Sequence, residues 1–339
     1  MVFIDACLGK QTPYTPIWMM RQAGRYLSEY QEIRKQAKNF LDLCANVDLA
    51  STITLQPVEI LDVDAAILFS DILILPHTMG LPLEFVPGFG PKFLRGIESL
   101  EDIQVLHTAY QKLEFVYDTL SSVRAKLEPS KALIGFSGAP WTLATYMIES
   151  QGSKTYHKSK KLLYTDPKLL HTLLDMLSTE IIGYLSMQIK AGADAIMLFD
   201  SWANALECKA YLEFGWSYIQ KITHTLKTMH KTIPIIVFPK GISGYLEHLN
   251  GDFDVFGCDW STPLELAKRI LGHRYVLQGN LEPARLYNQE AMLEGVMHIL
   301  EVMGKNPGFI FNLGHGMLAD LPRTIAIELV RLVHEKTKR

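Results

Sequence analysis

Eight short runs of apolar residues recur along the chain, and each is bounded by turn residues. The runs are continuous instead of alternating with polar positions, which is typical of parallel strands that are covered on both faces. Most of them are separated by stretches with helical periodicity, such as residues 169–192. The pattern therefore predicts eight β/α units. The predicted strands are residues 16–20, 65–71, 132–138, 194–200, 234–238, 254–259, 275–280 and 308–312.

Eight β/α units in one chain favour a closed (β/α)8 TIM barrel, an α/β fold, over a doubly wound sheet. A doubly wound dinucleotide-binding sheet carries a glycine-rich first turn with an acidic residue about 20 positions later, which this sequence lacks. No linker rich in Pro, Gly and Ser divides the chain, so we expect residues 1–339 to form a single domain. The segment of residues 80–93 is rich in Gly and Pro and is predicted to be either a lid or hairpin over the site or a surface loop.

The composition narrows the choice of partners. With 33 Lys and Arg against 36 Asp and Glu the net charge is −3, and no run of like charges dominates, so neither nucleic acid nor a membrane surface is an expected partner. The chain has no apolar stretch of the roughly 20 residues that span a bilayer and no secretory signal, and its cysteines are scattered. We therefore expect a cytoplasmic protein with free thiols. The cysteines are Cys7, Cys44, Cys208 and Cys258.

Polar residues follow nearly every predicted strand. In a (β/α)8 barrel the loops after the strands share one face, so these residues are expected to converge although they are far apart in sequence. They are Arg21, Arg25, Ser70, Asp71, Ser137, Trp141, Tyr146, Asp200, Ser201, Lys240, Asp259, Trp260, Asn280, Asn312 and His315.

Several of these residues also have an ordinary structural interpretation. Asp71 and Asp200 are equally well explained as caps of the helices that follow them. Ser201 is typical of a turn, and Tyr146 is typical of a core or rim position. His315 lies in the loop sequence NLGHG, where the flanking glycines allow a close approach to a ligand.

The pair Arg21 and Arg25 is harder to explain structurally. An apolar strand has just ended before them, and Gly24 lies between them, where it would cost a helix about 1 kcal/mol. Two guanidinium groups held near each other suit a polycarboxylate, because each binds a carboxylate through two hydrogen bonds. Arg34 is expected either to join this pair or to form an ion pair with Glu29 or Glu32 on its own helix.

Other chemistries lack their usual signatures. No histidine pair has metal-ligand spacing and no phosphate-binding loop occurs, so no metal site is expected. The segment GFSGA at residues 135–139 is similar to the nucleophile elbow of a hydrolase, with Ser137 as nucleophile and His315 available as base. The helix-like sequence after Pro140 and the absence of an HGGG-type oxyanion segment argue against that interpretation.

Six motifs together resemble the uroporphyrinogen decarboxylase family. They are PIWMMRQAGRYLSEY, FSDIL, GFSGAPWTLATYMIE, LFDSWA, GNLEP and FNLGHG, and they extend in order from residue 16 to residue 316. The resemblance implies a (β/α)8 homodimer, a carboxy-lyase of haem biosynthesis that needs no cofactor. It would convert uroporphyrinogen III to coproporphyrinogen III by removing four acetate carboxyl groups.

The resemblance also implies which residues form the site. Asp71, Arg21 and Tyr146 would be catalytic. The substrate-binding residues would be Arg21, Gln22, Ala23, Gly24, Arg25, Arg34, Asp71, Tyr146, Ser201 and His315. The sequence departs from the family pattern only in loop details, with Ser28 and Pro239 in place of the usual proline and alanine, and Glu282 in place of aspartate.

The implied chemistry suits these residues, because a protonated pyrrole ring can itself accept the electrons that decarboxylation releases. A carboxylate at Asp71 would stabilise the positive charge that develops there. An arginine side chain is a very weak acid, so the identity of the proton donor stays open.

Two alternatives remain. One is a corrinoid-dependent methyltransferase of the same fold, although this chain has Phe238-Pro239-Lys240 where those enzymes have a zinc-binding His-x-Cys. The other is a tetrapyrrole carrier without activity, which Asp71 argues against because carboxylate binding alone gives no reason for another negative charge in the site.

Overall fold

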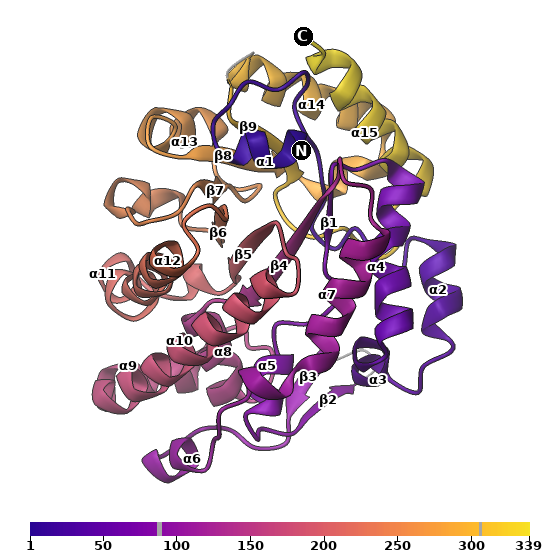
Figure 1. Ribbon diagram of the computed structural model, residues 1–339. Coiled ribbons are helices and arrows are strands. Elements are labelled where there is room, and N and C mark those ends of the chain that lie inside the picture. The colour runs from indigo at the N-terminus through magenta and orange to yellow at the C-terminus, as the bar shows by residue number, and fades with distance from the viewer. Residues whose placement is uncertain (87–89, 305–306) are drawn as a thin grey trace.

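Seven parallel strands and the helices that connect them form the body of the molecule (Figure 1). The computed structural model describes residues 1–86, 90–304 and 307–339. The strands follow one another around the sheet in chain order, and helices cover the outside, which confirms the predicted TIM-barrel architecture. The strands are β1 Ala65–Ile67, β4 Ala132–Gly138, β5 Ala195–Asp200, β6 Ile235–Pro239, β7 Val255–Gly257, β8 Val276–Leu281 and β9 Phe309–Leu313.

The first predicted strand, residues 16–20, closes the barrel without being a regular strand. Ile17 forms a single parallel bridge with Phe311 of β9, and the Asp64 amide donates to the Ile17 carbonyl over 2.8 Å. The segment thus fills the one place in the barrel that the seven strands leave, between β9 and β1. Its pairing is short because Pro16 has no amide hydrogen and because the Ile17 amide donates to the Asp64 carboxylate over 2.8 Å. The expectation of eight regular strands is corrected to seven strands and one closing segment.

The helices begin where the sequence supplies caps. The longest, α10, starts at Pro167, and the Asp166 side chain accepts a hydrogen bond from the Leu169 amide at 3.1 Å. Gly192 follows it with φ +112°, a conformation that favours glycine. In the described residues the α-helices are α1 Val2–Cys7, α2 Ser28–Arg34, α3 Phe40–Ala45, α4 Val47–Leu61, α5 Ile74–Thr78, α6 Leu100–Gln104, α7 Glu114–Lys126, α8 Pro140–Glu149, α9 His157–Thr165, α10 Pro167–Lys190, α11 Cys208–Tyr211, α12 Ser217–Met229, α13 Leu264–Leu271, α14 Gln289–Met303 and α15 Arg323–Thr337. Shorter helical turns are Tyr110–Lys112, Ala203–Ala205, Leu212–Trp216, Ser243–His248 and Pro283–Tyr287. None of the helices seen in these ranges is long and apolar enough to cross a membrane.

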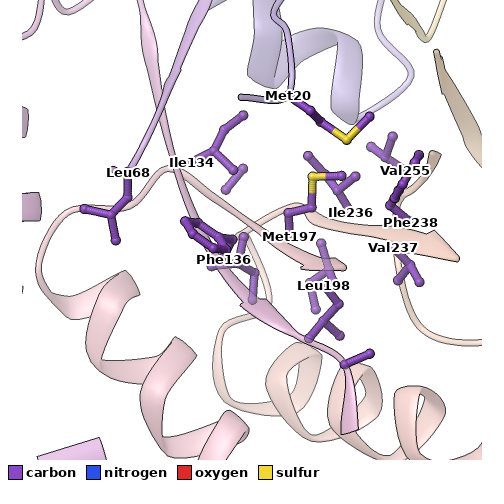
Figure 2. Close-up of a cluster of buried hydrophobic side chains, with 14 of the residues drawn as sticks. Met20, Leu68, Ile134, Phe136, Met197, Leu198, Ile236, Val237, Phe238 and Val255 are labelled. Carbon is purple, nitrogen blue, oxygen red and sulfur yellow. The ribbon is translucent and has the colours of Figure 1, made fainter. Parts of the chain in front are cut away.

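Apolar side chains from successive strands meet in the core, as Figure 2 shows. Met197 on β5, Ile236 on β6 and Val255 on β7 are register partners in turn, and all three are fully buried. Met20, from the closing segment, joins the same cluster. Burial of this kind stabilises each side chain by about 1.5–3 kcal/mol, which holds the strand ends in fixed positions.

The amino ends of three strands share one polar arrangement. An aspartate directly before the strand accepts a hydrogen bond from an amide near the start of the preceding strand or closing segment, and it also pairs with a basic side chain. The three sets are Asp64 with the Ile17 amide and His334, Asp194 with the Leu133 amide and Arg124, and Asp254 with the Ile235 amide and Lys227. The repetition ties neighbouring strands together at the end of the barrel away from the predicted site.

The segment of residues 80–93 contains a hairpin, so the surface-loop alternative is wrong. Its strands are β2 Leu83–Val86 and β3 Gly90–Phe93, which pair antiparallel, while residues 87–89 lie outside the described residues. The Phe93 amide donates to the Ser150 carbonyl over 2.7 Å, so the hairpin is fixed to the end of α8. Its action as a lid stays a prediction.

Candidate active site

The predicted site residues lie in the segments that follow the strands, at one end of the barrel. Arg21 and Arg25 follow the closing segment, Asp71 follows β1, and Ser201 follows β5. Tyr146 lies on α8 after β4, and His315 lies on the loop after β9. Burial is the largest influence on the pKa values of Asp71, Tyr146 and His315, raising the first two and lowering the third, and the nearby positive charge of Arg21 shifts all three downward. These three groups from three parts of the chain therefore lie around one guanidinium group.

Arg21 has an unusual backbone conformation. Its φ is +57°, in the left-handed region, which costs a residue other than glycine about 1–2 kcal/mol. Gly316, on the loop after β9, leaves room for its side chain, because a Cβ at Gly316 would lie 2.4 Å from the Arg21 Cδ. The closing segment thus ends in a sharp turn that directs Arg21 across the loop after β9.

The next three residues of the loop, 22–24, differ in whether their polar groups are used within the protein. The Gln22 side chain accepts from the Met19 amide at 3.1 Å and donates to the Ala65 carbonyl at 3.0 Å, so it fixes the loop to β1. The backbone carbonyl of Gln22 accepts from the Tyr26 hydroxyl at 2.7 Å, so both the side chain and the backbone of Gln22 are used within the protein. The amides of Ala23 and Gly24, in contrast, donate no hydrogen bond within the described residues. Both are half-buried and available to an anion.

The arginines of this region lack acidic partners. Within the ranges given above, neither Arg21 nor Arg25 forms an ion pair, and Arg34 donates only to the Ala37 carbonyl at 3.3 Å. The alternative that Arg34 pairs on its own helix is wrong, because other basic groups occupy both glutamates. Glu29 pairs with Arg323 and Glu32 pairs with Lys35, each over 2.6 Å. Unpaired guanidinium groups at one end of the barrel are suited to binding an anionic ligand.

Asp71 is half-buried and lies near Arg21. One of its oxygens accepts from the Leu73 amide at 2.8 Å, which fixes the turn that leads into α5. The other oxygen accepts no hydrogen bond within the described part of the chain. Burial raises the pKa of Asp71, while the Leu73 amide and the charge of Arg21 lower it. Asp71 thus supports a turn and also offers a free oxygen to a ligand.

Tyr146 is held beside aromatic rings. Its ring lies 5.6 Å from the ring of Trp202, which in turn lies 5.3 Å from Tyr156. Burial and the nearby charge of Asp71 raise the pKa of Tyr146 to about 12. The hydroxyl is therefore neutral at physiological pH and acts as a hydrogen-bond donor. Ser201 precedes Trp202 and is half-buried.

His315 is neutral in the site. Burial, followed by the charges of Lys240 and Arg21, lowers its pKa to about 4. Its Nδ1 accepts from the Gly316 amide at 2.7 Å, which assigns the ring hydrogen to Nε2. An imidazole in this form presents a single N–H donor to a ligand.

Comparisons with known proteins show the family of this chain. The family model described as Uroporphyrinogen decarboxylase (URO-D) matches residues 2–336. The chain belongs to the uroporphyrinogen decarboxylase family. A protein of this name from Helicobacter acinonychis is 65% identical over 339 residues, with 100% of both chains covered. Another from Helicobacter hepaticus is 62% identical over 340 residues, again with 100% of both chains covered.

The fold of this family member also occurs in other enzymes. A methyltransferase from Methanosarcina mazei aligns with a TM-score of 0.82 over 98% of this chain and 97% of its own, at 17% identity. A B12-independent methionine synthase from Shewanella aligns with a TM-score of 0.54 over 86% of this chain and 88% of its own, at 10% identity. At these identities the likeness shows the fold alone.

Two of the predicted polar residues, Asp200 and Ser137, are buried and bind other groups of the protein. Asp200 is fully buried and accepts from the Thr142 hydroxyl at 2.6 Å and the Tyr211 hydroxyl at 2.9 Å, so the helix-cap interpretation is wrong. Burial raises its pKa to about 6. Ser137 is buried and donates to the Gly138 carbonyl at 3.1 Å, whereas a nucleophile elbow presents its serine outward. The hydrolase alternative is therefore wrong.

Proposed function

We propose that this chain is a uroporphyrinogen decarboxylase, which removes CO2 from the four acetate side chains of uroporphyrinogen III and yields coproporphyrinogen III. The observation that carries the proposal is the set of arginines without acidic partners in the described residues at this end of the barrel, with Arg21 near a half-buried Asp71, in a chain of this family. A cyclic polycarboxylate with pyrrole N–H groups matches both the arginines and Asp71. Its carboxylates would pair with the arginines, and its N–H groups would donate to the Asp71 carboxylate.

The substrate itself supplies the electron sink. Protonation of a pyrrole ring carbon turns the ring into an iminium cation, and the C–C bond to the carboxylate then breaks with its electrons moving into the ring. CO2 leaves, and the former acetate carbon becomes an exocyclic methylene. Protonation of that methylene gives a methyl group, and loss of the proton first added to the ring carbon restores the neutral pyrrole. The free oxygen of Asp71 would accept hydrogen bonds from the pyrrole N–H groups and stabilise the cation as it forms.

The other groups position the substrate. Arg21, Arg25 and Arg34 would bind its carboxylates, together with the free amides of Ala23 and Gly24. Tyr146, Ser201 and the Nε2–H of His315 would donate to further oxygens. Arg21 is too weak an acid to protonate the ring, so we assign that proton to a water or substrate carboxyl group that Arg21 holds in place.

We also propose that residues 1–339 form one domain and that two copies associate in the cytoplasm. An exposed apolar surface on the loops after β7, β8 and β9 supports the dimer: Trp260 is 48% exposed, Tyr287 46% and Leu318 39%. The loops are linked, because the Trp260 amide donates to the Gly314 carbonyl at 3.2 Å and the Tyr287 hydroxyl donates to Asp320 at 2.5 Å. Sedimentation equilibrium tests the proposal, and a monomer at micromolar concentration would refute it.

Anaerobic incubation of the purified protein with chemically reduced uroporphyrinogen III tests the activity. Oxidation of the products to porphyrins and their chromatographic separation should reveal species with seven, six, five and four carboxyl groups. Binding of the substrate with no loss of carboxyl groups would instead favour a carrier.

A further inference from the structure

We propose that Lys240 binds a substrate carboxylate on the side of the barrel opposite Arg21 and Arg25. The inference rests on the proposed function and adds a subsite to it. Lys240 directly follows β6, whereas the two arginines follow the closing segment. With the closing segment in the first place and β1, β4 and β5 in the next three, β6 occupies the fifth of eight places. The two groups of cations therefore face each other across the barrel end.

Lys240 lies beside a residue already expected to contact the substrate. Asp200 and Pro239 are register partners in β5 and β6, and the Lys240 amide donates to the Asp200 carbonyl at 3.1 Å. Ser201, which directly follows Asp200, is thus the neighbour of Lys240 across the two strand ends. The ammonium also acts on the loop after β9, because its charge is the largest electrostatic influence that lowers the pKa of His315. Lys240 therefore belongs to the same site as Ser201 and His315.

The ammonium group of Lys240 has no partner among the residues that the structure describes. Five lysines are half-buried in the described part of the chain, and four of them have a partner. Their contacts are Lys131 with Asp62, Lys227 with Asp254, Lys268 with the Val302 carbonyl, and Lys160 with the ring of Tyr156. Within the same ranges the side chain of Lys240 forms no hydrogen bond, ion pair or ring contact, unlike those of the other four half-buried lysines. A partly buried ammonium without a partner is costly, so an external anion is the expected counterpart.

An acidic residue after the adjacent strand already has other partners. Asp259, which follows the adjacent strand β7, is buried and accepts four hydrogen bonds from donors other than Lys240. They come from the Gly241 amide at 2.7 Å, the Ser261 amide at 2.7 Å, the Ser261 hydroxyl at 2.5 Å and the Thr262 hydroxyl at 3.1 Å. The Gly241 contact turns the backbone after Lys240 toward β7 while the Lys240 ammonium stays free.

Steady-state kinetics of Lys240→Met tests the inference, with Lys231→Met as the matched control. Lys231 is exposed and precedes the same strand, at the opposite end of the barrel. A hydrogen bond to a charged group corresponds to about a 10- to 100-fold change in binding, so Lys240→Met should raise KM for uroporphyrinogen by that factor with a smaller change in kcat. Lys240→Arg should restore most of the affinity, and raising the salt concentration should reduce the difference from wild type.

Two readouts are independent of turnover. The Kd of uroporphyrin, the oxidised octacarboxylate, measured by fluorescence, should rise about tenfold or more in Lys240→Met and stay unchanged in Lys231→Met. The NMR-monitored pKa of His315 should rise in Lys240→Met only, because a neighbouring positive charge is removed. An unchanged KM and uroporphyrin Kd in Lys240→Met would overturn the inference. Failure of the wild-type protein to release CO2 would refute the proposed function instead, and the uroporphyrin Kd would still decide the role of Lys240.

Discussion

The left-handed backbone at Arg21 makes a prediction that separates stability from activity. Arg21 has φ +57°, which costs about 1–2 kcal/mol for any residue with a Cβ. Glycine removes that cost but adds about 0.4–1 kcal/mol of conformational entropy to the unfolded chain. Because the Arg21 side chain is exposed and unpaired, its loss should change the free energy of unfolding by no more than about 0.5 kcal/mol. Arg21→Gly should therefore be more stable than Arg21→Ala by about 0.5–1 kcal/mol.

Urea unfolding of both variants measures this difference, and decarboxylase assays accompany it. Both variants should lose most of their activity, because both lack the guanidinium group. The matched pair is Arg25→Gly and Arg25→Ala, since the φ of Arg25 is not positive. There the glycine variant should be the less stable one by about 0.4–1 kcal/mol, with the opposite sign. If Arg21→Gly were no more stable than Arg21→Ala, the argument from the strained turn would be wrong.

Three further predictions concern the aspartates. Asp71→Asn keeps an oxygen for the Leu73 amide, so it should fold and bind substrate but turn over slowly, and unchanged kcat would remove Asp71 from the mechanism. Asp200 has a pKa of about 6 in the folded protein, above the ~3.9 of an unfolded aspartate. Its protonated form therefore stabilises the fold by about 3 kcal/mol at pH values below ~4, and this stabilisation is lost as the pH rises through ~6. The unfolding free energy of Asp200→Asn relative to wild type should rise by about 2 kcal/mol between pH ~4 and ~7, and a flat difference would contradict the assignment. Asp194→Asn should lower the free energy of unfolding in urea by about 1–3 kcal/mol, because Arg124 loses its carboxylate partner. The kcat/KM should stay unchanged, because the pair lies far from the site. A loss of activity without a loss of stability would be inconsistent with this role.

The sequence predicted the barrel because continuous apolar runs and helical periodicity are local properties. Seven runs became strands for that reason. The remaining run, residues 16–20, has the same apolar character, but its pairing depends on Asp64 and Phe311, which are distant in the chain. Local pattern alone therefore placed the segment in the barrel without revealing that it forms only one bridge.

In the site, too, the sequence predicted what depends on neighbouring residues and missed what depends on residues distant in the chain. Asp71 and Asp200 each follow an apolar strand, in the similar sequences FSD and LFDS, and local reasoning treated them alike. Thr142 and Tyr211 occupy both oxygens of Asp200, whereas Asp71 keeps one oxygen free. In the sequence, the only sign of the unusual backbone at Arg21 is Gly316 in FNLGHG. A glycine indicates that another group approaches closely, but it does not identify that group.

The number of CO2 molecules released per porphyrinogen tests the central claim most directly. Uroporphyrinogen III labelled with ¹³C in its acetate carboxyl groups would be incubated without oxygen, with protein treated with a chelator and with no added cofactor. The account predicts four labelled CO2 molecules for each coproporphyrinogen formed, and much slower release by Asp71→Asn under the same conditions. Persistence of the octacarboxylate at a protein concentration equal to that of the substrate would contradict it.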